Sequence, residues 1–121
     1  MRSLIFIITL FTFATAYAET ASREPSVKVL KYRGAIQCDQ KSGTPPEIMR
    51  NELVKAGIEV ISVACGEDGR MHPMLCGTPT GAINIFEIPQ KNAAQAFKLG
   101  FAKLDSSSGA RETPCPAQLT Q

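Results

Sequence analysis

The most hydrophobic stretch of the chain lies near its beginning, where residues 4–13 are almost all apolar. Arg2 precedes this stretch, and Ala16-Tyr17-Ala18 follows it with the small-x-small pattern that signal peptidase cuts. The apolar run is shorter than the roughly 20 residues that a membrane-spanning helix needs. We therefore expect residues 1–18 to be a cleaved signal peptide, and residues 19–121 to be a single exported domain without a membrane span.

The first part of the exported chain has the pattern of a strand, a helix and a second strand. Residues 27–38 alternate imperfectly between apolar and polar positions, as a half-buried strand does. Thr44-Pro45-Pro46-Glu47 is typical of a helix start capped by Thr44, and Gly57 is a typical helix stop. Between them lies one apolar stripe, formed by Ile48, Met49, Leu53 and Ala56. Residues 58–65 are rich in β-branched side chains and predict the second strand.

The second part has a similar order after a long loop. Residues 66–80 contain five glycines and prolines, which predicts a loop. Residues 81–88 form an apolar run that predicts a third strand, and residues 92–99 predict a short helix. A last short strand is expected at residues 101–104, followed by an irregular tail at residues 105–121.

The order of these elements predicts the fold class. A weak internal echo supports two equivalent halves, because in each a proline is followed at the same offsets by a lysine, a glycine and an apolar residue: Pro46, Lys55, Gly57 and Ile58, then Pro89, Lys98, Gly100 and Phe101. Two such halves make a β-α-β-β-α-β chain. We expect an α+β domain of the ferredoxin-like type, with a small antiparallel sheet, two helices on one face and disulfides that stabilise it.

The net charge of the chain bears on whether its partner is a nucleic acid. The full chain has 13 Lys and Arg against 11 Asp and Glu. Arg2 is the only charged residue of the predicted signal peptide, so the exported part has a net charge of about +1. A charge this small gives no reason to expect nucleic acid as a partner.

All four cysteines follow the predicted signal peptide, at Cys38, Cys65, Cys76 and Cys115. An even number of cysteines in an exported chain of this length indicates disulfides, each of which contributes about 2–4 kcal/mol to stability. Four cysteines allow three pairings, and the spacing does not choose among them. No C-x-x-C pair is present, so a thioredoxin-like redox site is not expected.

No catalytic motif is recognisable along the chain. His72 is the only histidine, and no sequence signature surrounds a Ser or Cys as a nucleophile. Phosphate loops, dinucleotide fingerprints and zinc-ligand spacings are absent from the sequence. The acidic pair Glu67-Asp68 precedes Gly69 and is interpreted as part of a turn. We therefore expect a non-catalytic protein.

The densest group of side chains with binding chemistry lies in the loop of residues 66–81. The loop mixes charged with flexible apolar side chains, which suits contact with a partner at Arg70, Met71, His72, Met74 and Leu75. A structural alternative is that the apolar side chains cover the edge of the sheet. Our main expectation includes no cofactor, but thioether and imidazole groups suit Cu(I), so copper bound by Met71, His72 and Met74 is a further alternative.

Several of these features resemble part of a known family. Residues 60–65, the loop that follows, Cys76-Gly77 and residues 81–85 resemble the periplasmic domain of the Rcs envelope-stress sensor lipoprotein, over about residues 38–88. The chain lacks the lipidation cysteine and the proline-rich tether of that family. The resemblance implies a disulfide frame in which Cys65–Cys76 closes the loop at its neck, which leaves Cys38–Cys115 as the second bridge.

Together these observations predict a periplasmic or secreted binding or accessory protein of a bacterial envelope, whose partner is an envelope protein. The resemblance implies an envelope-stress sensor-like domain as an alternative. The group of Met and His side chains implies a periplasmic copper binder as another.

Overall fold

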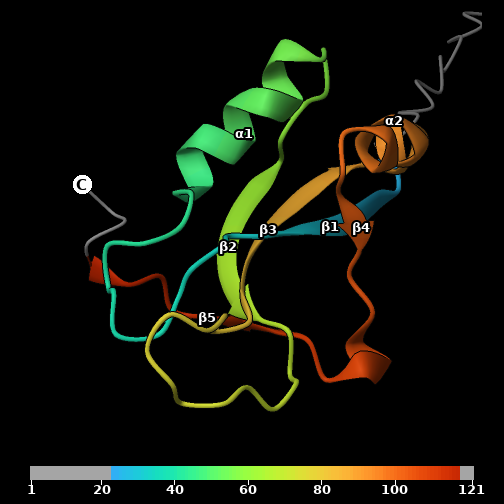
Figure 1. The fold of residues 1–121 in the computed structure, drawn as a ribbon. Helices are drawn as coiled ribbons and strands as arrows, with labels where there is room; N and C mark the ends of the chain where they lie inside the picture. Colours follow the sequence, from blue (N-terminus) through green and yellow to red (C-terminus); the bar gives the residue numbers. More distant parts are fainter. Residues whose placement is uncertain (1–22, 118–121) are drawn as a thin grey trace, which may run out of the picture.

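The computed structural model describes residues 23–117, so the predicted signal peptide lies outside the described residues. Figure 1 shows an α+β arrangement of one five-stranded antiparallel sheet and two helices, as the sequence predicts at this level. The sheet order is β4-β1-β3-β2-β5, where the strands are β1 Ser26–Tyr32, β2 Ser62–Glu67, β3 Ala82–Pro89, β4 Ala102–Lys103 and β5 Arg111–Thr113. The helices are α1 Pro46–Lys55 and α2 Ala93–Lys98, with short 3-10 turns at η1 Gln90–Asn92 and η2 Ser106–Ser108.

No helix within residues 23–117 has the length and apolar character needed to cross a membrane.

The central strand of the sheet is β3, and this position explains its apolar composition. β3 pairs with β1 on one side and with β2 on the other, so that Phe86 lies between Val29 and Val63. A strand paired on both edges and covered on both faces buries nearly every side chain, which favours a continuous apolar run over alternation. Most of the β3 residues are buried, as the run at residues 81–88 predicts.

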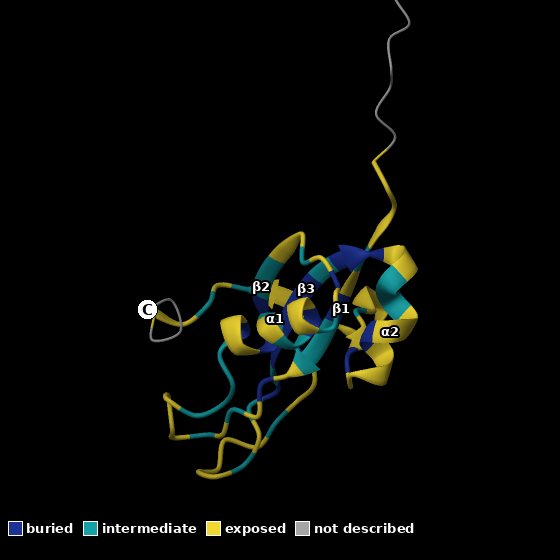
Figure 2. Cartoon of the chain, turned by 90° about the horizontal axis from the view of Figure 1, so that it is seen from above, coloured by how far each residue is buried: buried dark blue, intermediate teal, exposed yellow. Residues whose placement is uncertain are grey.

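Each face of the sheet has its own apolar layer. Both helices pack on the face of Phe86, where Leu53 of α1 and Ala96 of α2 join one core cluster. Figure 2 looks down on this face and shows the two helices lying over the strands. Ile83 and Ile85 point to the opposite face because side chains alternate along a strand. On that face, Leu104 and Ala110 pack against them, from the segment that links β4 to β5.

Helix α1 lies where the sequence predicts it, with two corrections. Thr44 does not cap the helix, since Pro45 occupies the cap position and no side chain caps the first turn. Instead, the Thr44 backbone donates to the Arg33 carbonyl oxygen, at 2.8 Å between N and O, and its own carbonyl accepts from Asn84. Ile48 of the expected apolar stripe is 54% exposed, so the core uses the rest of that stripe.

The ends of the strands differ from the prediction. β1 ends at Tyr32, although backbone hydrogen bonds continue irregularly, as from Thr80 N–H to the Ala35 carbonyl oxygen. β2 begins at Ser62 rather than at residue 58, and Ile58 is instead a buried core residue between the helix and the strand. The prediction of an irregular tail is wrong where β5 forms, since β5 pairs with the edge of β2.

The structure contains two disulfides, Cys38–Cys76 and Cys65–Cys115, and no free cysteine among the described residues. All four cysteines therefore pair, as predicted. The pairing of Cys65 with Cys76 and of Cys38 with Cys115 is wrong. Because β1 lies beside β3, the residues that follow β1 meet the residues that precede β3, and this brings Cys38 to Cys76.

Cys65 is not free to reach Cys76 because β2 continues past it to Glu67. Inside the sheet, Cys65 lies opposite Asn84 on β3 and opposite Thr113 on β5. The β5 strand therefore carries Cys115 to Cys65. The tail is tied to a central position of the sheet and not to the end of the first strand.

Candidate functional site

The loop that joins β2 to β3, residues 68–81, is anchored at its neck and along its length. At the neck, the Asp68 backbone donates to the Gly81 carbonyl oxygen at 3.0 Å. The Cys38–Cys76 disulfide fixes the returning arm to the segment after β1. A turn near that bridge is closed by Thr78, whose hydroxyl donates to the Leu75 carbonyl oxygen at 2.6 Å. Figure 1 shows this loop projecting at the end of the molecule opposite the two helices.

Asp68 is a buried anchor and not a simple turn residue. Its carboxylate accepts from the Tyr32 hydroxyl at 2.9 Å, from the His72 ring at 2.9 Å and from the Arg70 backbone N–H at 3.0 Å. The Arg70 contact is the local bond of an Asx turn, which the Asp68-Gly69 dipeptide favours. The contacts to Tyr32 and His72 join the loop to β1 and to itself, so one carboxylate organises the first half of the loop.

The pKa of Asp68 reflects this set of donors. Burial of the carboxyl group acts to raise its pKa, but the Arg70 backbone N–H and the side chains of His72 and Tyr32 outweigh burial and hold the pKa below its ordinary value. The ionised form is therefore stabilised in the folded protein. Burial of the phenol, together with its hydrogen bond to Asp68, raises the pKa of Tyr32.

Gly81 allows the His72 ring to lie on Asp68. Its φ of +80° is in the left-handed region that favours glycine. A Cβ at this position would collide with the imidazole of His72 and with the Asp68 carboxylate. The close packing of ring, carboxylate and backbone therefore requires glycine at the end of the loop.

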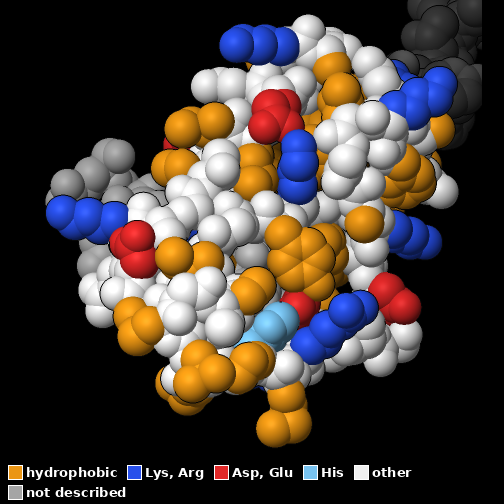
Figure 3. Space-filling view, viewed as in Figure 1, with side chains coloured by type: hydrophobic (Ala, Val, Ile, Leu, Met, Phe, Trp, Pro, Cys, Tyr) orange, Lys and Arg blue, Asp and Glu red, His pale blue; other side chains and the backbone are white. Residues whose placement is uncertain are grey.

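The tip of the loop presents apolar side chains to solvent. Met71 and Met74 are 101% and 88% exposed, and Leu75 is 64% exposed. In Figure 3, hydrophobic side chains gather at the lower end of the molecule around the pale-blue histidine. The alternative in which these side chains cover the sheet edge is therefore wrong. Together with Arg70 and His72, these residues are named the loop tip.

The geometry bears on the copper hypothesis through His72. Its Nε2 atom is hydrogen-bonded to Asp68, which leaves Nδ1 as the ring nitrogen that could bind a metal. A carboxylate on the second nitrogen is a common partner of a metal-binding imidazole. Within residues 23–117, no group of three or more His, Cys, Asp or Glu side chains is arranged to hold a metal ion, so any metal here would depend on thioether ligands.

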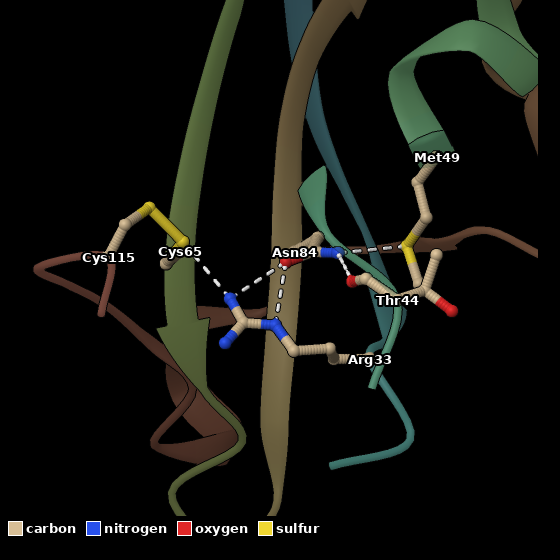
Figure 4. Close-up of a disulfide and its surroundings, with 6 residues drawn as sticks. All are labelled: Arg33, Thr44, Met49, Cys65, Asn84 and Cys115. Carbon is tan, nitrogen blue, oxygen red and sulfur yellow. Dashed lines mark hydrogen bonds between the residues drawn. A yellow bond between two sulfur atoms is a disulfide. The ribbon is translucent and has the colours of Figure 1, made fainter. Parts of the chain in front are cut away.

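A second cluster of polar side chains lies inside the domain, beside the Cys65–Cys115 disulfide (Figure 4). Arg33 is only 5% exposed, and its guanidinium donates to Asn84 Oδ1 from Nε at 3.2 Å and from Nη2 at 3.0 Å. Nη2 also lies 3.1 Å from Cys65 Sγ. The Asn84 amide in turn donates to the Thr44 carbonyl oxygen at 3.0 Å.

Arg33 carries a charge that is almost entirely buried. Within residues 23–117, no carboxylate forms an ion pair with this guanidinium. Burial lowers the pKa of Arg33, because removal from water disfavours the charged form. Asn84 and the sulfur compensate only in part, since both are neutral. The residue therefore keeps the capacity to attract an anion.

The sequence prediction placed the loop tip correctly in the loop but missed the residues that hold it. The sequence pattern places Arg33 in the first strand and Asp68 in a turn, and it indicates no special role for Tyr32 or Asn84. The signals are present but weak: an Asp-Gly pair whose Asp68 lies four residues before a lone histidine, and a single asparagine inside a largely apolar strand. An asparagine buried in a central strand needs partners for its amide, and this predicts a buried polar cluster.

Comparisons with models of protein families, with curated proteins and with solved structures found no match to this chain.

Replacement of Asp68 by asparagine tests its anchoring role. We expect Asp68→Asn to lower the free energy of unfolding at neutral pH by about 1–3 kcal/mol, the range for hydrogen bonds to a charged group. Because the folded pKa lies below 3.8, the stabilisation is complete above that pH and is lost as the pH falls through the folded value. The difference in free energy of unfolding between wild type and variant, measured by urea unfolding, should therefore shrink below pH 3.8.

Glu59→Gln is the matched control, because Glu59 is exposed and the same change of acid to amide there removes no buried contact. It should leave stability within about 0.5 kcal/mol of wild type. A difference for Asp68→Asn that stays constant down to pH 2, or an Asp68 titration midpoint above 3.8 by NMR, would contradict the anchoring role.

Proposed function

We propose that this chain is a non-catalytic, exported binding protein of a bacterial envelope that recognises a partner protein with its loop tip. The observation that carries the proposal is the exposure of Met71, Met74 and Leu75 on a loop fixed at both arms. Contiguous exposed apolar side chains are a common mark of an interaction site. Methionine in particular suits binding surfaces, because its thioether is flexible and polarisable.

Preorganisation strengthens the proposal. The Cys38–Cys76 disulfide and the Asp68–His72 hydrogen bond hold the loop before a partner arrives. A fixed loop loses less conformational entropy on binding. The free-energy cost of ordering a side chain on binding is about 0.5–1.5 kcal/mol, and this cost is avoided for each side chain that is already ordered. A loop that served only as a connection would not need anchors on both arms.

The charge of the loop favours one kind of partner. Residues 69–80 contain one charged side chain, Arg70, beside the three apolar ones. The complementary surface is an apolar groove bordered by a carboxylate on another exported protein. An anionic membrane is the weaker choice, because one basic side chain adds only about 1 kcal/mol of attraction to a lipid surface.

We also propose an export route and a fold type. Export is supported by the sequence of residues 1–18 and by two disulfides, which persist in oxidising compartments.

The proposed fold type is supported by the strand order. The order β4-β1-β3-β2 is the one expected of a ferredoxin-like core, to which β5 is added at the β2 edge.

The loop-tip proposal is tested by cross-linking followed by affinity measurement. A photoreactive residue placed at Met74 should cross-link to a defined envelope protein in living cells, whereas the same residue at Ile48 on α1 should not. With the purified pair, Met71→Ala combined with Met74→Ala should weaken binding at least tenfold by calorimetry, since central interface residues contribute about 1–2 kcal/mol each. The melting temperature should change by less than about 3 °C, because both side chains are exposed.

The matched control is Ile48→Ala combined with Val54→Ala, which removes two other exposed apolar side chains. Affinity should be unchanged in this variant. The proposal fails if the double methionine variant binds as tightly as wild type. Equal cross-linking of anionic vesicles and protein would assign the tip to membrane contact instead.

Copper binding is a second candidate, favoured by the Asp68 contact that holds the His72 ring and by the exposure of Met71 and Met74 on either side of His72 in the sequence. The disulfide-bonded protein should hold one equivalent of Cu(I) against a moderate chelator. Met71→Leu with Met74→Leu should abolish retention because leucine keeps the apolar bulk but removes both sulfurs. Retention of one equivalent by the double variant would exclude this site.

A further inference from the structure

A pocket of about 630 Å³ lies beside Cys38 of the Cys38–Cys76 disulfide, lined mainly by residues of the segment after β1 and around the start of β3. This volume lies within the range of small-molecule sites. Buried Arg33 forms part of its wall and is the one cationic side chain that lines it. The rest of the lining combines apolar and polar residues: Ala35, Ile36, Ala82, Pro116 and the disulfide-bonded Cys38, with Gln37, Asp39, Gln40, Ser42 and Thr80.

The Arg33 guanidinium is held in place by hydrogen bonds from two of its three nitrogens. Nε and Nη2 are both engaged, by Asn84 Oδ1 and by Cys65 Sγ. Nη1 has no acceptor among residues 23–117, and Figure 4 draws no dashed line to it. The guanidinium is therefore fixed through two of its nitrogens, and its side chain lines the pocket.

We propose that this pocket binds a small monocarboxylate with a short apolar body. The carboxylate would accept from Arg33 and supply a counter-charge that no carboxylate within residues 23–117 provides, while the apolar body would lie along Ala35 and Ile36. The inference does not depend on the loop tip, because none of the tip residues lines the pocket.

Charge and shape favour a monocarboxylate over a phosphate. A phosphate group carries up to two negative charges and needs several donors, whereas Arg33 is the one cationic side chain that lines the pocket. Exposed Asp39 also lines the pocket, and a second negative charge on the ligand would be repelled by it. A neutral apolar ligand would leave the Arg33 charge uncompensated.

The test uses the mature, disulfide-bonded protein and three probes: sodium hexanoate, hexanol and inorganic phosphate. Binding is followed by NMR through the Arg33 Nε–H signal and the Thr80 and Ala82 amides. Hexanoate should shift these signals in a saturable way, and hexanol of the same chain length should bind at least tenfold more weakly. Phosphate should give no saturable shift at Arg33.

Two alanine-to-leucine substitutions distinguish binding in the pocket from binding elsewhere on the surface. Ala35→Leu fills the pocket and should weaken hexanoate binding at least tenfold, while Ala94→Leu on exposed α2 should leave it unchanged. The proposal is overturned if hexanoate gives no saturable shift at Arg33, if hexanol or phosphate binds as well, or if Ala35→Leu binds hexanoate like wild type.

Discussion

The antiparallel pairing of β1 with β3, closed by the Cys38–Cys76 disulfide, fixes the end of the molecule where both candidate sites lie. The pairing runs through the two strands and continues through irregular backbone hydrogen bonds, such as the one from Gln37 N–H to the Thr78 carbonyl oxygen at 2.8 Å. The disulfide ends this ladder, the loop tip precedes Cys76 in the sequence, and Cys38 lines the Arg33 pocket.

Tyr32, the last residue of β1, and Arg33, the next residue, connect the β1–β3 pairing to the two candidate sites. Successive side chains of a strand point to opposite faces, so Tyr32 and Arg33 reach different surroundings. Tyr32 donates to Asp68, which organises the loop, and Arg33 donates to Asn84 beneath the helices. Both faces therefore hold a buried charge of opposite sign. The Asp68 carboxylate accepts from three residues, whereas no carboxylate within residues 23–117 pairs with Arg33, and this contrast is the reason for proposing an anionic ligand at Arg33.

The sequence predicted the elements whose signal is local. The helix of α1 and the apolar run of β3 follow from periodicity and composition, and the loop follows from its glycines and prolines. The disulfide pairing was wrong because it depends on which strands are neighbours, and Cys38 and Cys76 meet only because β3 lies beside β1. The roles of Arg33 and Asp68 were missed for the same reason, since their partners are distant in sequence. Exposure of the loop tip was one of two alternatives that the sequence left open.

The central claim is that a disulfide-anchored loop presents a preformed apolar tip, and backbone ¹⁵N relaxation measures this most directly. In the oxidised protein, the order parameters of residues 70–75 should lie well above about 0.6, the value below which backbone is flexible. In Cys38→Ser combined with Cys76→Ser, they should fall below that value while those of β3 stay unchanged. A tip with order parameters below about 0.6 in the oxidised protein would contradict the account.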